Sequence, residues 1–258
     1  MKNIFIIILF LTLISFTNDQ GLPLVENTAF QTGEKLRYRI SYGIIDAGEA
    51  TLEIRTTERK VKGRNMFHIV GKGKTLGAFN SFYKVRDRYE TYIDKKGIFP
   101  WYFKRRVNEG GYKITQDYSF KHHYKKVHTG EQTFEIPIGI QDMISSFYFA
   151  RTLDFKNIYK GKVFEFNCFM DNEIYPLKIK YVGKEKITIR KGKFNCLKFV
   201  PVVQTGRYFK SEDDVNFWIT DDKNKIPVLV KAKIPVGTIR LHLVDWDGLK
   251  NRLESRIK

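Results

Sequence analysis

Strict two-residue alternation of apolar and charged side chains is the feature that most limits how this chain can fold. Residues 35–42 place apolar or aromatic side chains on one face and polar ones on the other: Leu36, Tyr38, Ile40 and Tyr42 against Lys35, Arg37, Arg39 and Ser41. Successive side chains of a strand point to opposite sides of the sheet, so this pattern predicts a half-buried β-strand. Residues 49–55 alternate in the same way, and we expect Asp46-Ala47-Gly48 to form the turn of a hairpin between the two segments.

A second hairpin is predicted around Gly110-Gly111, because glycine readily adopts the positive φ angles of a two-residue turn. This turn would place Arg105 opposite Gln116 within a row of large side chains: Trp101, Phe103 and Val107 on one strand, and Ile114, Tyr118 and Phe120 on the other. A buried guanidinium is unfavourable unless a partner satisfies it. We therefore expect Arg105 to pair with Gln116 at the rim of the sheet, to meet an internal carboxylate or amide, or to point into a cavity.

One helix is predicted among the strands, over residues 141–153. Its apolar side chains recur at helical spacing, and Asp142 suits the first turn because an acidic group there complements the helix dipole. Alternating segments separated by short polar turns continue to residue 244, with no Gly/Ser-rich linker. The sequence thus predicts an all-β fold, a strongly curved antiparallel sheet or partly open barrel with one central helix.

The two ends of the chain are expected to lie outside this domain. Residues 1–19 begin with a short basic segment and an apolar run from Ile4 to Phe16. As a helix the run would rise only about 20 Å, less than the roughly 30 Å of a membrane core. This favours a secretory signal peptide over an uncleaved anchor, and hence export to the periplasm or outer cell envelope. We expect an irregular lead-in at residues 20–33, one domain at 34–250 and a basic tail at 251–258.

The charge of the chain bears on its partners. Lys and Arg number 46 and Asp and Glu number 28, which gives a formal net charge of +18. So basic a chain usually suggests nucleic acid, but an exported protein meets lipid head groups and cell-wall polymers instead. We expect a lipid or another anionic envelope component as partner, peripheral membrane contact and no nucleic acid. The alternative is that the scattered cations only keep a large β-surface in solution.

Two cysteines, Cys168 and Cys196, are present. An oxidising compartment permits a disulfide between them. The alternative is that both are small buried hydrophobic residues in neighbouring strands.

Motifs for catalysis or cofactor binding are missing from the sequence. Gly73-Lys74-Thr75 looks like the end of a phosphate-binding loop, but His68 stands where that loop needs its first glycine. His122 and His128 would lie about 20 Å apart along a strand, too far to share a metal ion. We expect no cofactor and no metal site.

Several phrases carry a family resemblance: residues 33–38, residues 42–50, Asp87-Arg88-Tyr89-Glu90-Thr91 and Trp218-Ile219-Thr220-Asp221-Asp222. Together they resemble the exported bacterial family known as domain of unknown function 3108, from about Gly33 to Val244. The resemblance implies an exported all-β envelope protein and supplies no reaction or ligand. It also implies a curved sheet similar to the half-barrels of periplasmic lipoprotein carriers.

The function expected from these observations is non-enzymatic. We expect an envelope protein that binds a hydrophobic or amphipathic, anionic, lipid-like ligand, or that acts as an envelope scaffold. The candidate ligand-binding residues are Trp101, Phe103, Arg105, Gln116, Tyr118 and Arg151. The alternative is an envelope hydrolase acting on glycan or lipid, which needs at least two titratable groups in one cleft. Its candidates are His68, Asp142, Asp221 and Asp222.

Overall fold

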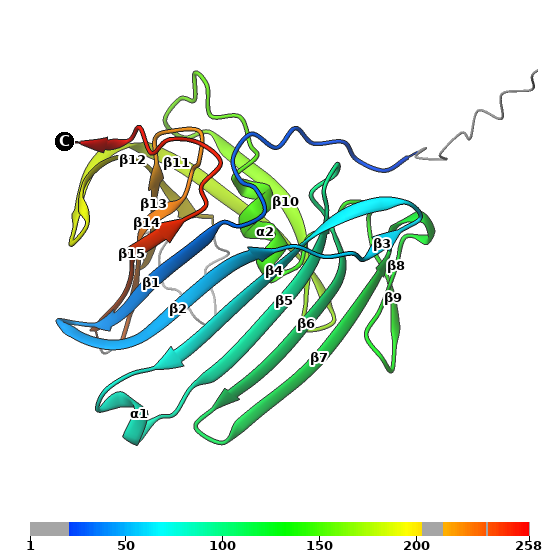
Figure 1. Cartoon of the computed structure of the whole chain (residues 1–258), viewed down its shortest axis with the longest axis horizontal. Coiled ribbons are helices and arrows are strands. Elements are labelled where there is room, and N and C mark those ends of the chain that lie inside the picture. The colour runs from blue at the N-terminus through cyan, green and yellow to red at the C-terminus, as the bar shows by residue number, and fades with distance from the viewer. Residues whose placement is uncertain (1–20, 203–213, 236, 258) are drawn as a thin grey trace, which may run out of the picture.

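The computed structural model describes residues 21–202, 214–235 and 237–257. One antiparallel sheet runs through them and curves around a central helix (Figure 1). The strands of the first half are β1 (Lys35–Tyr42), β2 (Ile45–Arg55), β3 (Lys60–Val61), β4 (Arg64–Thr75), β5 (Arg86–Asp94), β6 (Pro100–Glu109), β7 (Tyr112–Lys121), β8 (Lys126–His128) and β9 (Thr133–Glu135). Those of the second half are β10 (Val163–Met170), β11 (Glu173–Ile189), β12 (Gly192–Pro201), β13 (Val215–Thr220), β14 (Pro227–Ile234), β15 (Gly237–Asp247) and β16 (Arg256–Ile257). The helical elements are α1 (Phe79–Phe82), the 3₁₀ turn η1 (His122–Tyr124) and α2 (Met143–Ala150).

Neighbouring strands of the sheet are mostly neighbours in sequence. The spatial order is β10-β11-β12-β13-β14-β15-β1-β2-β4-β5-β6-β7-β8-β9, with β3 beside β4 and β16 beside β12. The two halves of the chain join where β1 pairs with both β2 and β15. The predicted all-β fold with one central helix is therefore confirmed.

The β6–β7 hairpin has the predicted register. Arg105 lies opposite Gln116 and Phe103 opposite Tyr118, and Gly110 and Gly111 form the turn with φ angles of 57° and 96°. The turn predicted for the first hairpin was wrong, because β2 already begins at Ile45 and residues 46–48 belong to that strand. Gly43, with a φ of 60°, turns the chain instead. The loss of alternation near residue 46 reflects a register shift in the β1–β2 ladder rather than a turn.

Helix α2 is shorter at both ends than the 141–153 predicted. Asp142 is its N-cap, and the Asp142 carboxylate accepts hydrogen bonds from the backbone N–H groups of Ile144 and Ser145, at 2.8 and 2.7 Å. The Ser145 hydroxyl accepts one in return from the Asp142 N–H, which completes a capping box. Tyr148 is fully buried against Phe30 of the lead-in and the strand residues Ile54, Ile69 and Ile93. We call the sheet face that packs against α2 the inner face.

The two ends of the sheet meet mainly through side chains. Among the described residues, the free edge of β10 pairs with backbone only at Gln141, whose N–H and carbonyl bond to Asn167 and Phe169. The Phe169 ring lies 5.3 Å from the ring of Tyr118 on β7. The sheet is thus a partly open barrel, closed along this seam by packing more than by a backbone ladder.

The terminal segments contribute to the core. Ala29 and Phe30 of the lead-in are buried, and residues 21–33 form no strand. Residues 251–258, which we expected to form a separate basic tail, include β16, which pairs with Lys193 and Phe194 of β12. The predicted signal peptide lies outside the described residues. No helix in the described ranges is long and apolar enough to cross a membrane.

The disulfide considered for Cys168 and Cys196 is contradicted, since both thiols are free and buried. Cys168 on β10 lies opposite Tyr175 of β11, whereas Cys196 on β12 lies opposite Glu185 of β11, ten residues further along that strand. Ten residues of strand correspond to roughly 30 Å, far beyond the Cα separation of about 7 Å at which a disulfide can form.

Candidate functional site

Burial of the inner face decreases along most strands away from α2, although Gly48 of β2 and Val107 of β6 stay buried. On β1, Leu36 and Tyr38 are buried but Ile40 is only partly buried, and β2 changes in the same way from Ile54 to Ala50. The turns β1–β2, β6–β7 and β14–β15 mark this end of the barrel, which we call the open end (Figure 1). Other partly exposed apolar side chains of the inner face follow in register on neighbouring strands: Leu241, Val230, Ala232 and Phe217, with Ile239 more exposed still.

Small residues of β2 and β4 leave room on the inner face. Gly71 lies opposite Leu52, and Gly73 lies opposite Ala50. A methyl group placed on Gly71 would meet Ile144 of α2 at 3.5 Å, whereas one placed on Gly73 would meet only the Cβ of Asp87, at 3.9 Å. The contact of the helix with this part of the sheet therefore ends near Gly71, and among the described residues only Asp87 approaches the position beyond it at Gly73.

Polar side chains lie on the inner face beside this apolar surface. We call Asp87, Tyr89, Arg105, Glu109, Gln116 and Asp171 the inner polar cluster. The Arg105 guanidinium donates to the side-chain Oε1 of Gln116 at 3.3 Å and to the Asp171 carboxylate at 2.9 Å. The side-chain amide of Gln116 donates to the same Asp171 oxygen at 3.1 Å. Arg105 thus has both an amide and a carboxylate partner. Its side chain is 14% exposed and that of Asp171 is 50% exposed.

Two further carboxyl groups face the same side at the open end. Burial, and then the neighbouring Asp87, raise the pKa of Glu109, while Arg105 acts in the opposite direction. The Asp87 carboxylate accepts a hydrogen bond from the Asn108 N–H at 3.0 Å. Burial, and then the Asp171 carboxylate, raise the pKa of Tyr118. The cluster thus contains three carboxyl groups, Asp87, Glu109 and Asp171, beside one guanidinium.

The structure places the predicted ligand residues in three different surroundings. Arg105 and Gln116 belong to the inner polar cluster, with Phe103 and Tyr118 packed beneath it in the core. Trp101 instead lies near the opposite end of β6, where its indole N–H donates to the Asp94 carboxylate at 3.1 Å. Asp94 also accepts from the Arg64 guanidinium, so Trp101 is part of a buried structural network.

Arg151 is buried just beyond the C-terminal end of α2. Its guanidinium donates to both carboxylate oxygens of Glu34, at 2.6 and 2.8 Å, and its Nε donates to the Asn224 carbonyl at 3.0 Å. The rings of Phe30 and Tyr148 lie 5.3 Å from the guanidinium carbon. This arrangement ties the lead-in and α2 to the β13–β14 connection and leaves Arg151 away from the inner polar cluster.

The four residues proposed for a hydrolase lie on separate elements. Asp142 caps α2 and is fully buried, and His68 bonds the Glu90 carboxylate on the outer face at 2.6 Å. Asp221 pairs with Lys184, and Asp222 accepts hydrogen bonds within the β13–β14 turn. Among the described residues, no three His, Cys, Asp or Glu side chains come together as a metal site.

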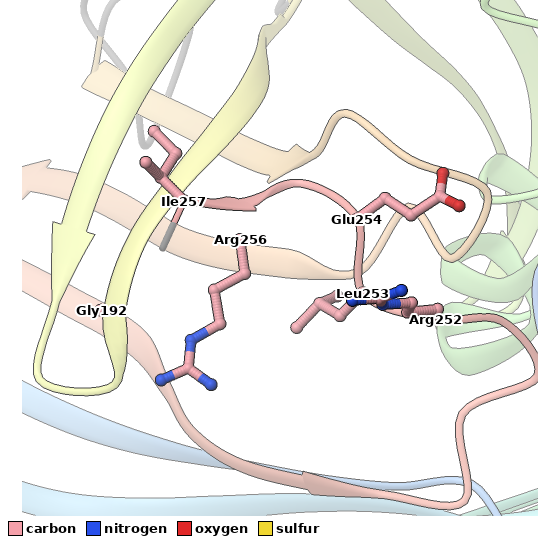
Figure 2. A pocket seen from close by; sticks show the side chains of 6 residues that line it. All are labelled: Gly192, Arg252, Leu253, Glu254, Arg256 and Ile257. Carbon is pink, nitrogen blue, oxygen red and sulfur yellow. The ribbon is translucent and has the colours of Figure 1, made fainter.

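A surface pocket of about 670 Å³ lies between the C-terminal segment and the β11–β12 turn (Figure 2). Gly192, Arg252, Leu253, Glu254, Arg256 and Ile257 line it, and none of the predicted site residues does. The Arg256 guanidinium lies 5.8 Å from the ring of Trp246.

The acidic members of the inner polar cluster were not predicted from the sequence. Asp87 shares its strand face with Tyr89 and Ile93, so an acid on the apolar face was visible in the alternation. Asp171 gave no such signal, because its contact with Arg105 depends on closure of the barrel.

The fold and its inner face define a class of antiparallel, barrel-like β-proteins that carry a helix inside an incompletely closed sheet. The family model described as "Protein of unknown function (DUF3108)" matches residues 37–244, and the chain belongs to this family. No curated protein matches the sequence significantly.

One solved structure supports the fold. The chain is similar to a β-barrel-like protein of the DUF1849 family from Brucella abortus, with 11% identity and a TM-score of 0.57 over 85% of this chain and 99% of that one. A hypothetical protein from Chlamydia trachomatis (9% identity, TM-score 0.36, 88% and 92% covered) and a candidate lipoprotein from Parabacteroides distasonis (8% identity, TM-score 0.36, 87% and 99% covered) resemble it less. At such identities the first likeness shows the fold alone.

Proposed function

We propose that this protein is an exported, non-enzymatic protein of the cell envelope that holds an amphipathic, lipid-like ligand on its inner face. The supporting observation is the loss of burial along most strands of the inner face beyond α2, where apolar side chains are partly exposed and, among the described residues, a methyl group added to Gly73 would meet only Asp87. Concave apolar surfaces with a few converging polar groups are the usual form of ligand sites. The apolar part of the ligand would cover Ile40, Leu241 and Val230.

The inner polar cluster would hold the polar end of the ligand. Arg105 is the cation of this cluster, and Asp171 already occupies it. An anionic head group would therefore have to displace Asp171, whose half-exposed side chain would turn into solvent. Gln116 would keep its hydrogen bond to Arg105 and offer its amide N–H to the same head group.

The envelope location is part of the proposal. The predicted signal peptide at residues 1–19 and the net charge of +18 suit a compartment bounded by anionic lipids. A scaffold role is the competing proposal, and it requires no ligand at the open end.

Titration with a fluorescent fatty acid, supported by native mass spectrometry, tests the ligand. Gly73→Leu adds a large side chain to the inner face, and Gly73 does not have the positive φ that would strain a leucine. This variant should bind the fatty acid about tenfold more weakly, or worse, because the side chain would fill part of the proposed site. The matched control is Thr115→Leu, which adds a similar side chain to the outer face of β7. Equal binding by both variants, or no binding by the wild-type protein, would reject the proposal in favour of a scaffold.

A further inference from the structure

Four connections at the open end form one continuous rim. The β14–β15 turn contacts the β1–β2 turn through a hydrogen bond from the Gly43 N–H to the Thr238 carbonyl, at 3.1 Å. The Tyr42 ring then lies 6.5 Å from Phe79 of α1, in the β4–β5 connection. The Gly110 N–H, in the β6–β7 turn, donates to the Lys84 carbonyl at 2.9 Å. Figure 1 shows the β1–β2 turn, α1 and the β6–β7 turn at this same end.

Large apolar and aromatic side chains project from this rim into solvent. Ile44 is 98% exposed and Phe82 is 88% exposed, and three more are at least half exposed. We call these five residues the exposed rim: Ile44, Ile45, Phe82, Tyr83 and Tyr112. Turns are normally built from small and polar residues. No residue of α1 is buried, so Phe82 contributes nothing to the core.

The exposed rim is bordered by cations. Five exposed basic side chains stand on the same connections or on the adjoining strand ends: Lys74, Lys84, Arg86, Lys113 and Lys233. Lys74 and Arg86 are direct cross-strand partners, a like-charge pairing that weakens a sheet. Of the acids at this end, Glu49 pairs with Lys74 of this border at 3.7 Å, whereas Asp46 pairs with Arg39 and Arg190, and Glu109 faces inward beside Asp87.

We propose that the exposed rim docks this protein onto an anionic lipid bilayer, with Ile44, Phe82 and Tyr112 entering the head-group region. Apolar and aromatic side chains flanked by Lys and Arg are the combination that binds at membrane surfaces, where cations meet lipid phosphates. A second copy of the chain fits less well, since the same positive charges would face each other. Docking would face the open end towards the bilayer, and it does not require that the inner face binds a ligand.

Vesicle co-sedimentation with the full chain tests this docking. The wild-type protein should bind phosphatidylglycerol-containing vesicles, bind pure phosphatidylcholine vesicles less well, and lose binding as salt is added. The double variant Ile44→Ser/Phe82→Ser should bind the anionic vesicles at least about tenfold more weakly, because it removes the two most exposed apolar side chains.

The control variant removes two other largely exposed side chains, at the opposite end of the barrel. Leu24 is 74% and Tyr124 is 68% exposed, near the β5–β6 turn and in η1, and Leu24→Ser/Tyr124→Ser should leave vesicle binding unchanged. Equal loss in both double variants, or no binding by the wild type, would overturn the proposal. A wild-type dimer that becomes monomeric in Ile44→Ser/Phe82→Ser without any vesicle binding would overturn it in favour of self-association.

Ligand binding in solution separates this proposal from the proposed function. The rim variant should bind the fluorescent fatty acid as the wild type does, since its substitutions lie outside the inner face. Gly73→Leu should retain vesicle docking for the same reason. Either proposal can therefore fail while the other stands.

Discussion

At the scale of single residues, burial shifts the pKa values of two titratable groups, His122 and Asp142, so that each favours its uncharged form. Burial lowers the pKa of His122 to about 4, and the hydrogen bond from its Nε2–H to the Pro100 carbonyl acts in the opposite direction. Its Nδ1 accepts a hydrogen bond from the Gly139 N–H. One neighbour can only accept and the other can only donate, so they fix the neutral tautomer. The position of His122 in η1 also corrects the expectation that it continues the strand towards His128.

Burial raises the pKa of Asp142 to about 6 against the hydrogen bonds from Ser145, Thr91 and Ile144 that favour its charge. A raised pKa means that the folded protein holds the proton more tightly, so this group contributes stability below its unfolded pKa that is lost as pH rises through about 6. Asparagine keeps the N-cap and removes the charge.

We therefore predict that Asp142→Asn is stabilising relative to wild type near neutral pH. This advantage should shrink by about 3 kcal/mol as pH falls from about 7 to about 3, because the carboxyl becomes protonated first in the folded and then in the unfolded wild-type protein. Urea unfolding at a series of pH values measures the difference, with Asp142→Ala as the control that loses the cap at every pH. A difference independent of pH would contradict the prediction.

At the scale of elements, the Arg151–Glu34 pair joins segments that are far apart in the sequence. Glu34 begins the path from the lead-in to β1, and Arg151 follows α2 directly. Both side chains are almost completely removed from solvent, so each depends on the other for its charge. The pair therefore determines how α2 and the lead-in sit against each other inside the sheet.

Glu34→Gln should destabilise the fold by about 3–5 kcal/mol, because it leaves the buried Arg151 charge without its carboxylate. The double variant Glu34→Gln/Arg151→Met should recover much of this loss, since no unpaired charge remains. Free energies of unfolding from urea titrations of both variants and Arg151→Met complete the cycle. Additive losses would show that the two charges are not coupled.

The features that were predicted correctly from the sequence are those set by the alternation of side chains within a few residues. The period of β1 and the register of Arg105 and Gln116 follow from alternation and from the Gly110-Gly111 turn, which act within a few residues. The turn at residues 46–48 was wrong because a ladder irregularity and a turn break alternation alike. The partners of Arg105 and Arg151, Asp171 and Glu34, arrive only when distant segments meet. Periodicity holds no information on such closure.

At the scale of the whole molecule, the seam between β10 and β7 decides how firmly the barrel is closed. Phe169 packs against Tyr118 there, and the Asp171 carboxylate bridges to Arg105 and Gln116. Asp171 thus links the β10–β11 turn to the β6–β7 hairpin across the seam, and we call its two hydrogen bonds the latch.

Removing this latch should loosen the seam. Asp171→Ala leaves a largely buried guanidinium without its carboxylate, and we expect a loss of about 1–2 kcal/mol and faster amide exchange in β10. Asp117→Ala is the matched control, since Asp117 is similarly exposed and pairs with Arg106 on the outer face, where the expected loss is below about 1 kcal/mol. Hydrogen exchange with mass spectrometry measures both, and identical profiles would show that Asp171 closes nothing.

The seam has a consequence for what the molecule can enclose. A barrel with a continuous backbone ladder has a fixed circumference, because it widens only when a whole row of backbone hydrogen bonds breaks. Here closure depends on the contact between the Phe169 and Tyr118 rings, the latch and the short backbone link at Gln141. We therefore expect the barrel to widen or narrow along this seam while its strands stay paired.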